Sequence, residues 1–204
     1  MAVLIIDYGM SNLSSIKRAL EECGADVFIS DNPKDIKKAE RVVLPGVGAF
    51  ADGMMNLNNR GWTGAIKEEV LTNKIPLLGV CLGMQLLADK GYEGGETEGL
   101  GLIPGEVSIL NKKNESERIP HIGWNEIKKV RHDKLLDGIS DNSDFYFVHS
   151  YSLNPKDNYC ILAETPHCGS FVSIVKKDKV YGVQFHPEKS SSNGFLLLKN
   201  FLRV

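Results

Sequence analysis

The chain of 204 residues has no hydrophobic run near the roughly 20 residues that a membrane-spanning helix needs. Its first segment, Met1–Asp7, has no basic start and ends in an acid, so it does not have the pattern of a secretory signal. The sequence also lacks an excess of one charge, with 24 basic residues, 26 acidic residues and a net charge of −2. A charge so near zero provides no strong field for nucleic acid or for a membrane surface. We therefore expect a cytoplasmic protein with neither of these partners.

Cysteine is scarce too: the chain has four, at positions 23, 81, 160 and 168, and no Cys-x-x-Cys pair. Isolated cysteines of this number are too few for the disulfide scaffold of a small secreted protein. His167 and Cys168 are adjacent, but no second pair stands at the spacing of metal ligands. We expect free thiols in a reducing compartment, no bound metal and no cofactor.

The composition, 42% hydrophobic and 25% charged, is ordinary for a globular protein and excludes a disordered or coiled-coil chain. The length fits one domain over residues 1–204. In the first half, apolar runs typical of buried strands alternate with helical spacing, as at Ile16, Ala19, Leu20 and Cys23. The strands predicted here are 3–7, 26–29, 41–44 and 76–80. Such an order predicts a parallel sheet with helices on both faces.

The second half has shorter apolar runs, separated by Asn, Gly, Lys and Asp turns. They predict strands at 102–110, 123–130, 145–149, 160–163, 171–175 and 180–185. We also expect a hairpin turn at 176–179, a final helix at 195–202 and an exposed hairpin tip over the polar segment 111–118.

The segment Gly79-Val80-Cys81-Leu82-Gly83 follows a predicted strand and precedes the helix-like residues 84–88. Strand, Gly-x-nucleophile-x-Gly and helix form a nucleophile elbow, which holds the nucleophile at the carboxyl end of a strand. The helix N-terminus favours the thiolate of Cys81, and the Leu82 amide would face an oxyanion formed on an attached acyl group. For this motif alone, a buried cysteine in a tight turn is an open alternative.

A cysteine nucleophile needs a base, and the base needs an orienting carboxylate. Among the five histidines, His186 precedes a proline, which favours extended backbone, and Glu188 follows. Residues two apart in extended chain project to one side, so one nitrogen of His186 can face Cys81 while the other donates to Glu188. A solvated His-Pro-Glu turn is the alternative. His121 and His149 lie in apolar or aromatic settings and fit pocket-lining and interior histidines equally well.

The segment Pro45-Gly46-Val47-Gly48-Ala49-Phe50-Ala51 nearly matches a dinucleotide-binding fingerprint. The proline before it and the lack of an acid about 20 residues later argue against that function. We interpret it as a glycine turn at the sheet edge that can offer backbone N–H groups to an oxyanion or a substrate. A purely structural turn is the alternative.

Gly79–Gln85 together with Gln184–Ser190 resembles the class I (triad) glutamine amidotransferases. Further segments carry the same resemblance along nearly the whole chain: Asp7–Gly9, Pro45–Phe50, Gly99–Gly105, Pro120–Asn125 and Tyr146–Tyr151. The set of motifs in this order is specific, although any one of them alone is not.

This resemblance implies a three-layer, flavodoxin-like α/β fold whose mixed central sheet is mostly parallel. It implies that Cys81 is the nucleophile, His186 the general base and acid, and Glu188 the residue that orients the histidine. Leu82 and Val47 would supply the oxyanion amides. The residues implied to hold glutamine are Gly48, Gln85, Glu93, Ser150 and Tyr151.

The family further implies a glutaminase that docks on a (β/α)₈ cyclase subunit and passes ammonia to it. A paralogous subunit that supplies ammonia for amidation of a cell-surface sugar has the same triad, so the residues leave the pathway open. Two other classes of protein fit these residues less well. A non-enzymatic binding module would not need all three triad residues, and a cysteine hydrolase would not account for the glycine turn together with the segment around Trp124.

Overall fold

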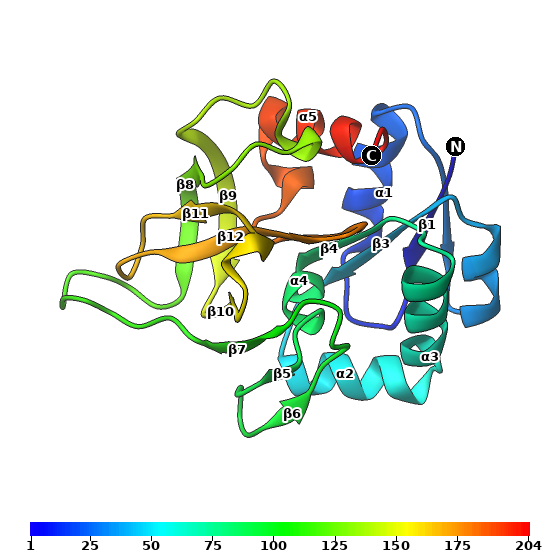
Figure 1. Cartoon of the computed structure of the whole chain (residues 1–204), viewed down its shortest axis with the longest axis horizontal. Helices are drawn as coiled ribbons and strands as arrows, with labels where there is room; N and C mark the ends of the chain where they lie inside the picture. The colour runs from blue at the N-terminus through cyan, green and yellow to red at the C-terminus, as the bar shows by residue number, and fades with distance from the viewer.

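The computed structural model describes residues 1–204 and contains two β-sheets flanked by helices (Figure 1). The nine-stranded sheet has the order β2-β1-β3-β4-β13-β12-β11-β8-β9. Its strands are β1 (Ala2–Ile6), β2 (Asp26–Ser30), β3 (Arg41–Gly46), β4 (Leu77–Cys81), β8 (His121–Lys129), β9 (Ser143–His149), β11 (Ile161–Thr165), β12 (Phe171–Lys177) and β13 (Val180–Val183). The smaller sheet contains β10 (Tyr151–Pro155), β7 (Gly105–Ile109), β5 (Lys90–Gly91) and β6 (Thr97–Glu98). The α-helices are α1 (Leu13–Glu22), α2 (Phe50–Asn59), α3 (Trp62–Lys67), α4 (Leu82–Leu86) and α5 (Ser191–Phe201).

The large sheet is mixed, as predicted, but parallel pairing covers only half of it. The pairings among β2, β1, β3, β4 and β13 are parallel. Those among β13, β12, β11, β8 and β9 are antiparallel. The reason is the length of the connections: a turn as short as residues 178–179 can join only antiparallel neighbours, whereas parallel neighbours need a crossover.

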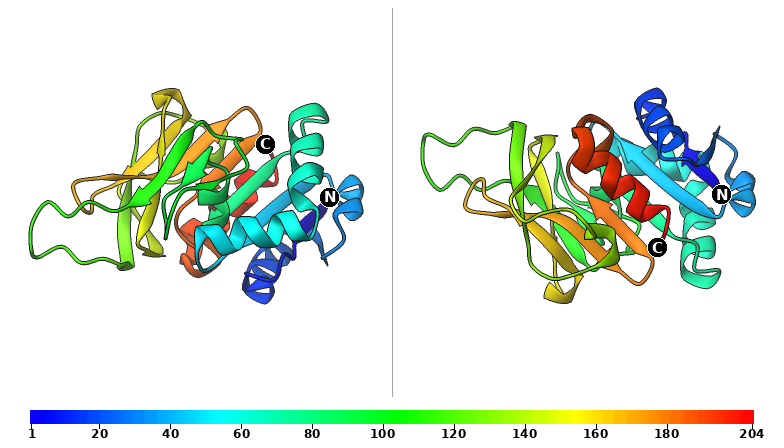
Figure 2. Two further views of the ribbon diagram at one scale, coloured as in Figure 1. Left: turned by 90° about the horizontal axis from the view of Figure 1, so that it is seen from below. Right: turned by 90° about the horizontal axis from the view of Figure 1, so that it is seen from above.

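Helices cover both faces of the large sheet, so the three layers are as expected (Figure 2). Side chains of β1 alternate between two hydrophobic cores because successive residues of a strand point to opposite faces. Val3 and Ile5 belong to the core that contains the buried side chains of α1 and α5. Leu4 and Ile6 belong to the core of α2, α3 and α4. None of the helices combines the length and hydrophobicity that crossing a bilayer would require.

Several predicted boundaries differ from the structure. The strand predicted at 102–110 begins only at Gly105, and the one at 180–185 ends at Val183. Helix α2 was not predicted, because a glycine and several asparagines weaken its helical signal. The segment 111–118 is exposed and projects from the body, but it is not a hairpin tip (Figure 2). It connects β7 of the small sheet to β8 of the large one.

The chain turns sharply at Cys81, between β4 and α4. Cys81 has a φ of +55°, which is rare for a residue with a side chain and is stabilised only by its surroundings. Gly83 lies so close to strand β3 that a Cβ there would be 1.8 Å from the Leu44 carbonyl oxygen. A Cβ on Gly79 would be 2.6 Å from the Gly83 carbonyl oxygen. The two glycines therefore permit the close approach of helix and strands that holds the turn.

This packing predicts that Gly83→Ala lowers the free energy of unfolding by about 3 kcal/mol or more, because the new methyl group meets backbone that cannot move away. Gly64→Ala is the matched control. Gly64 is exposed within α3, and a Cβ there meets nothing within 4 Å. It should raise stability by about 0.5–1 kcal/mol. Chemical denaturation of both variants measures the difference, and equal stabilities would contradict the packing argument.

Candidate active site

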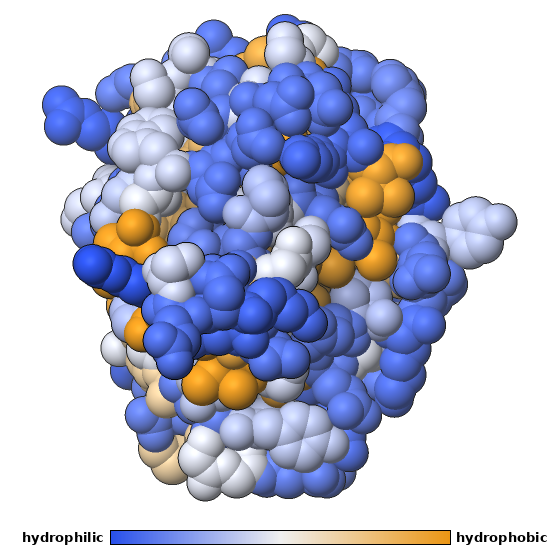
Figure 3. Space-filling model, turned by 90° about the vertical axis from the view of Figure 1, so that its left-hand side faces the viewer, coloured by the Kyte–Doolittle hydropathy of each residue, from blue (hydrophilic) through white to orange (hydrophobic).

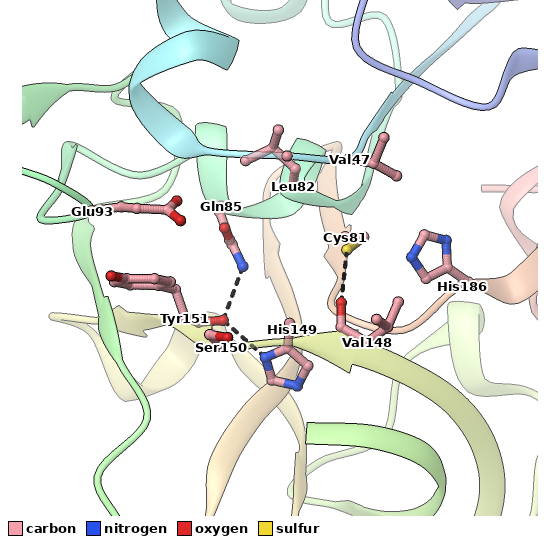
Figure 4. Close-up of a pocket in the computed structure, with 11 residues that line it drawn as sticks. Val47, Cys81, Leu82, Gln85, Glu93, Val148, His149, Ser150, Tyr151 and His186 are labelled. Atoms are coloured by element: carbon pink, nitrogen blue, oxygen red, sulfur yellow. Dashed lines mark hydrogen bonds between the residues drawn. The ribbon is translucent and has the colours of Figure 1, made fainter. Parts of the chain in front are cut away.

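A cavity of about 300 Å³ opens at the carboxyl end of β4, where Cys81 stands (Figure 4). All the predicted site residues except Glu188 line it, and Glu188 contacts His186. The lining residues are Val47, Gly48, Cys81, Leu82, Gln85, Glu93, Val148, His149, Ser150, Tyr151 and His186. Residues from four distant segments of the chain therefore meet in one place.

His186 and Glu188 form a buried pair, with 2.8 Å between Nδ1 and Oε1. In Figure 4 the other ring nitrogen of His186 lies on the side of Cys81. His186 itself is extended, as the following proline predicts. Glu188, however, lies in a 3₁₀ turn over Pro187–Lys189, so the pair is formed by that turn and not by the alternation of an extended strand.

The surroundings of His186 favour its charged form. Burial lowers its pKa, but the neighbouring Cys81 and the hydrogen-bonded, negatively charged Glu188 outweigh burial and raise the pKa to about 10. A charged imidazolium is an acid that can supply a proton to a leaving group.

Backbone hydrogen bonds keep His186 in place. Its N–H donates to the Tyr146 carbonyl at 2.9 Å, and its carbonyl accepts from the Ser190 hydroxyl at 2.6 Å. Ser190 Oγ in turn accepts from the Tyr146 N–H at 3.0 Å. The histidine is therefore held against β9 from both sides of its peptide.

The sulfur of Cys81 contacts two groups that the sequence did not identify as site components. The thiol donates to the Val148 carbonyl at 3.9 Å, and Gln184 Nε2 donates to the sulfur at 3.9 Å. Gln184 is fully buried and also accepts from Gln85 Nε2 at 3.2 Å. Its place beside His186 in the segment Gln184–Ser190 was the only local signal, and its contact with the sulfur depends on tertiary packing.

The two amides expected to face an oxyanion differ. Leu82 is the first residue of α4, where a helix leaves its N–H groups without intrahelical partners. The Val47 N–H, by contrast, donates to the Met10 carbonyl at 2.8 Å. In this conformation it is not available to the cavity. Gly48 follows with a φ of +107°, a backbone region that favours glycine.

The wall opposite the triad is built from hydrogen-bonded polar groups. Glu93 accepts from the Phe50 N–H at 2.8 Å through Oε2, which caps the start of α2. The Tyr151 carbonyl accepts from Gln85 Nε2 at 2.9 Å and from His149 Nδ1 at 2.9 Å. Ser150 lies between His149 and Tyr151, where β9 passes into β10. This wall can offer a carboxylate and backbone groups to a small polar ligand.

The four cysteines are free, and no three His, Cys, Asp or Glu side chains are grouped in a way that could hold a metal ion. A cysteine and a His–Glu pair at one small cavity can in principle perform nucleophilic attack with proton transfer.

Comparison with known proteins identifies close relatives along the whole chain. The HisH 1 subunit of imidazole glycerol phosphate synthase from Campylobacter jejuni is 47% identical over 202 residues, 99% of this chain and 100% of the relative. The HisH subunit of Moorella thermoacetica is 46% identical, over 98% of this chain and 93% of its own. The HisH subunit of Aquifex aeolicus is 43% identical, over 100% and 97%.

Solved structures share the fold at lower identity. A glutamine amidotransferase structure has a TM-score of 0.72 at 17% identity and covers 96% of this chain and 98% of its own. A glutamine amidotransferase from Thermotoga maritima has a TM-score of 0.64 at 22% identity, over 95% and 78%. The model of the family "Glutamine amidotransferase class-I" matches residues 4–204. The chain belongs to the class I glutamine amidotransferase family and, within it, to the HisH subunits of imidazole glycerol phosphate synthase.

Proposed function

We propose that this chain hydrolyses L-glutamine to L-glutamate and ammonia and delivers the ammonia to a HisF-type (β/α)₈ cyclase subunit. In this heterodimer the cyclase converts the nucleotide PRFAR to imidazole glycerol phosphate and AICAR, a step of L-histidine biosynthesis. The family supports the pathway. The observation that carries the chemistry is the buried His186–Glu188 pair, 2.8 Å apart, at the cavity where Cys81 ends its strand.

The proposed reaction runs through a thioester. The Cys81 thiolate attacks the side-chain amide carbon of glutamine, and the carbonyl oxygen takes up the negative charge. His186 donates a proton to the departing nitrogen, which leaves as ammonia while the C–N bond breaks. His186 then accepts a proton from water, the hydroxide attacks the thioester, and glutamate leaves with the thiolate restored. Glu188 keeps the imidazole oriented and stabilises its charged form.

Glutamine binding fits the opposite wall. We assign its α-ammonium group to the Glu93 carboxylate, which has one oxygen outside its hydrogen bond to the Phe50 N–H. Backbone groups at Gly48, Ser150 and Tyr151, with Gln85 behind them, would hold the rest of the substrate. These contacts are polar and directional, as recognition of a small amino acid requires.

A partner surface lies beside the nucleophile. The cross-strand pairs Ile122–Val148 and Trp124–Tyr146 stand side by side on β8 and β9. Ile122 is 61% exposed, Trp124 55% and Val148 36%, although large apolar side chains are usually buried. Figure 3 shows the side of the molecule that carries these strands, with separate hydrophobic patches among hydrophilic side chains. Since the Val148 carbonyl contacts Cys81, a subunit docked there would cover the site where ammonia forms.

Shielding by a partner has a chemical reason. Ammonia that escapes into bulk water is protonated, and ammonium is not nucleophilic. We infer that residues 1–204 form one amidotransferase domain that works with its partner in the cytoplasm. The four free cysteines support that compartment.

The hydrogen bond between Val47 and Met10 supports a second role for the partner. We infer that the peptide before Val47 reorients when the loaded cyclase binds, so that its N–H joins the Leu82 amide at the oxyanion. The glycines on either side of Val47 make such a rotation possible. Glutamine turnover would then depend on a partner ready to use the ammonia.

Cys81→Ser should abolish glutamine hydrolysis, because the hydroxyl is far less acidic than the thiol it replaces. The cyclase reaction of the reconstituted complex with PRFAR should persist when ammonium salt replaces glutamine. In the unaltered complex PRFAR should stimulate glutamine turnover. Unchanged turnover in Cys81→Ser would refute the catalytic assignment, and an absence of stimulation by PRFAR would refute the pathway and leave amidation of a surface sugar.

The His186 assignment predicts how its pKa responds to substitution. Both Cys81→Ser and Glu188→Gln should lower this pKa below about 10, since each removes a group that raises it while burial stays. Titration of the imidazole signals by NMR measures the change.

The raised pKa of His186 also predicts how stability depends on pH. A folded-state pKa above 6.5 stabilises the folded protein below pH 6.5, and this stabilisation is lost as the pH rises toward 10, so the unaltered protein should become less stable over this range. The Glu188→Gln variant should lose less stability over this pH range than the unaltered protein. An identical pH dependence of stability in the two proteins would contradict the electrostatic coupling of His186 to Glu188.

Val47→Pro tests the oxyanion amide, because proline has no N–H to donate. The variant should lose about 100-fold in kcat for glutamine hydrolysis by the complex with PRFAR, as removal of one oxyanion donor usually does. Val47→Ala keeps the N–H and serves as the control, with activity expected to stay within a few-fold. Full stimulation of Val47→Pro would exclude this amide from the reaction.

A further inference from the structure

Three histidines outside the triad gather between the glutamine cavity and an outer groove. His149 lines the cavity, while His121 and His167 line a groove of about 800 Å³ beside Trp124. His121 and His149 are each only 6% exposed. The rings of His121 and His167 stack, with 4.1 Å between centroids. The mechanism proposed above uses none of the three.

Hydrogen bonds join His149 and His121 into a chain that has only one consistent direction. The Tyr151 carbonyl can only accept, so His149 Nδ1, 2.9 Å away, carries a proton. His149 Nε2 then accepts from His121 Nδ1 at 3.2 Å. His121 Nε2 in turn accepts from the Asn125 amide group at 3.2 Å. The Asn125 side-chain oxygen accepts from the Glu126 N–H at 2.9 Å. The NH₂ group of Asn125 therefore points toward His121.

The hydrogen-bond chain requires His149 and His121 to be neutral, and their surroundings favour that form. Burial lowers the pKa of His149 to about 3; its bond to the Tyr151 carbonyl opposes the shift, and the neighbouring His121, His167 and His186 add to it. Burial, together with His167, lowers the pKa of His121 to about 4. A second proton on either ring would occupy a nitrogen that now accepts a hydrogen bond, and two N–H groups would then face each other. The direction of the hydrogen bonds therefore requires both rings to be neutral.

The two ends of the chain lie at functionally different places. Its inner end is the Tyr151 carbonyl, which Gln85 also holds, in the wall proposed to bind glutamine. Its outer end is Asn125 on β8, next to the exposed Trp124. Tyr151 and Asn125 are thus connected by side chains alone.

We propose that Asn125, His121 and His149 form a one-directional hydrogen-bond chain that positions the Tyr151 carbonyl and ties the glutamine-binding backbone to strand β8. His121 and His149 act here as positioning residues and not as proton donors to substrate. The part of the proposal that concerns glutamine rests on the proposed function, whereas the protonation pattern does not.

The protonation pattern can be read from the ring ¹⁵N chemical shifts of the full chain labelled at histidine. Between pH 6 and 8, His149 and His121 should both be neutral with the proton on Nδ1. His132, which is exposed and lies 3.2 Å from an Asp137 oxygen through Nε2, provides a reference signal from a surface histidine. If either His149 or His121 carries its proton on Nε2, or is an imidazolium, the proposed hydrogen-bond chain is refuted.

Kinetics of two variants in the complex test the positioning role. His149→Leu removes the donor to Tyr151 and should raise KM for glutamine roughly three- to tenfold with a smaller change in kcat. His149→Asn keeps a donor near the place of Nδ1 and should restore KM to near its original value, while His132→Gln should leave it unchanged.

An unchanged KM in His149→Leu, or equal KM values in the Leu and Asn variants, would refute positioning by His149. If neither variant folds, the ¹⁵N shifts of the unaltered protein still decide whether the chain exists. Failure of the proposed function is distinct, because it shows as glutamine turnover by Cys81→Ser with the ¹⁵N pattern intact.

Discussion

The site depends on the close packing of α4 against strands β3 and β4. Gly83 sits against the Leu44 carbonyl with no room for a methyl group, and the chain must reverse within one residue to allow this. That residue is Cys81, at a positive φ. This sharp backbone turn places its sulfur at the carboxyl end of the parallel strand β4, facing the cavity. Every other functional group is arranged around a position that backbone packing has set.

The opposite half of the site comes from the antiparallel part of the sheet. β13 pairs in parallel with β4, so both strands end at the same edge of the sheet and His186, which follows β13, lies near Cys81. β9 provides the Tyr146 carbonyl that holds the His186 N–H and the Val148 carbonyl that contacts the sulfur. The mixed sheet therefore joins an elbow typical of parallel α/β folds to a wall of antiparallel strands.

Electrostatics differ sharply between histidines a short distance apart. His186 and His149 are both buried and line the same cavity, yet their pKa values move in opposite directions. Glu188 and Cys81 raise the pKa of the first, while the second has no carboxylate partner and lies beside a carbonyl, other histidines and the rings of Phe147 and Phe171. One is thereby suited to proton transfer and the other to fixed, directional hydrogen bonding. Burial alone accounts for the lowered pKa of His149, whereas the partners of His186 reverse the direction that burial would give.

The sequence by itself determined the chemistry that local geometry controls. Closely spaced glycines after an apolar strand singled out Cys81, and a proline and a glutamate after His186 singled out the pair that the structure places at the same cavity. The motif order also determined the family and the fold class. Strand boundaries near Gly105 and Val183 and the helix Phe50–Asn59 were less predictable, because tertiary packing there overrides weak local signals.

Only the tertiary structure decided that Gln184 reaches the sulfur, that the Val47 N–H is held by Met10, and that His121 lies beside His149. These are contacts between segments up to 103 positions apart. Hydrogen-bond partners at such separations are set by strand order and register, which no local pattern of residues encodes.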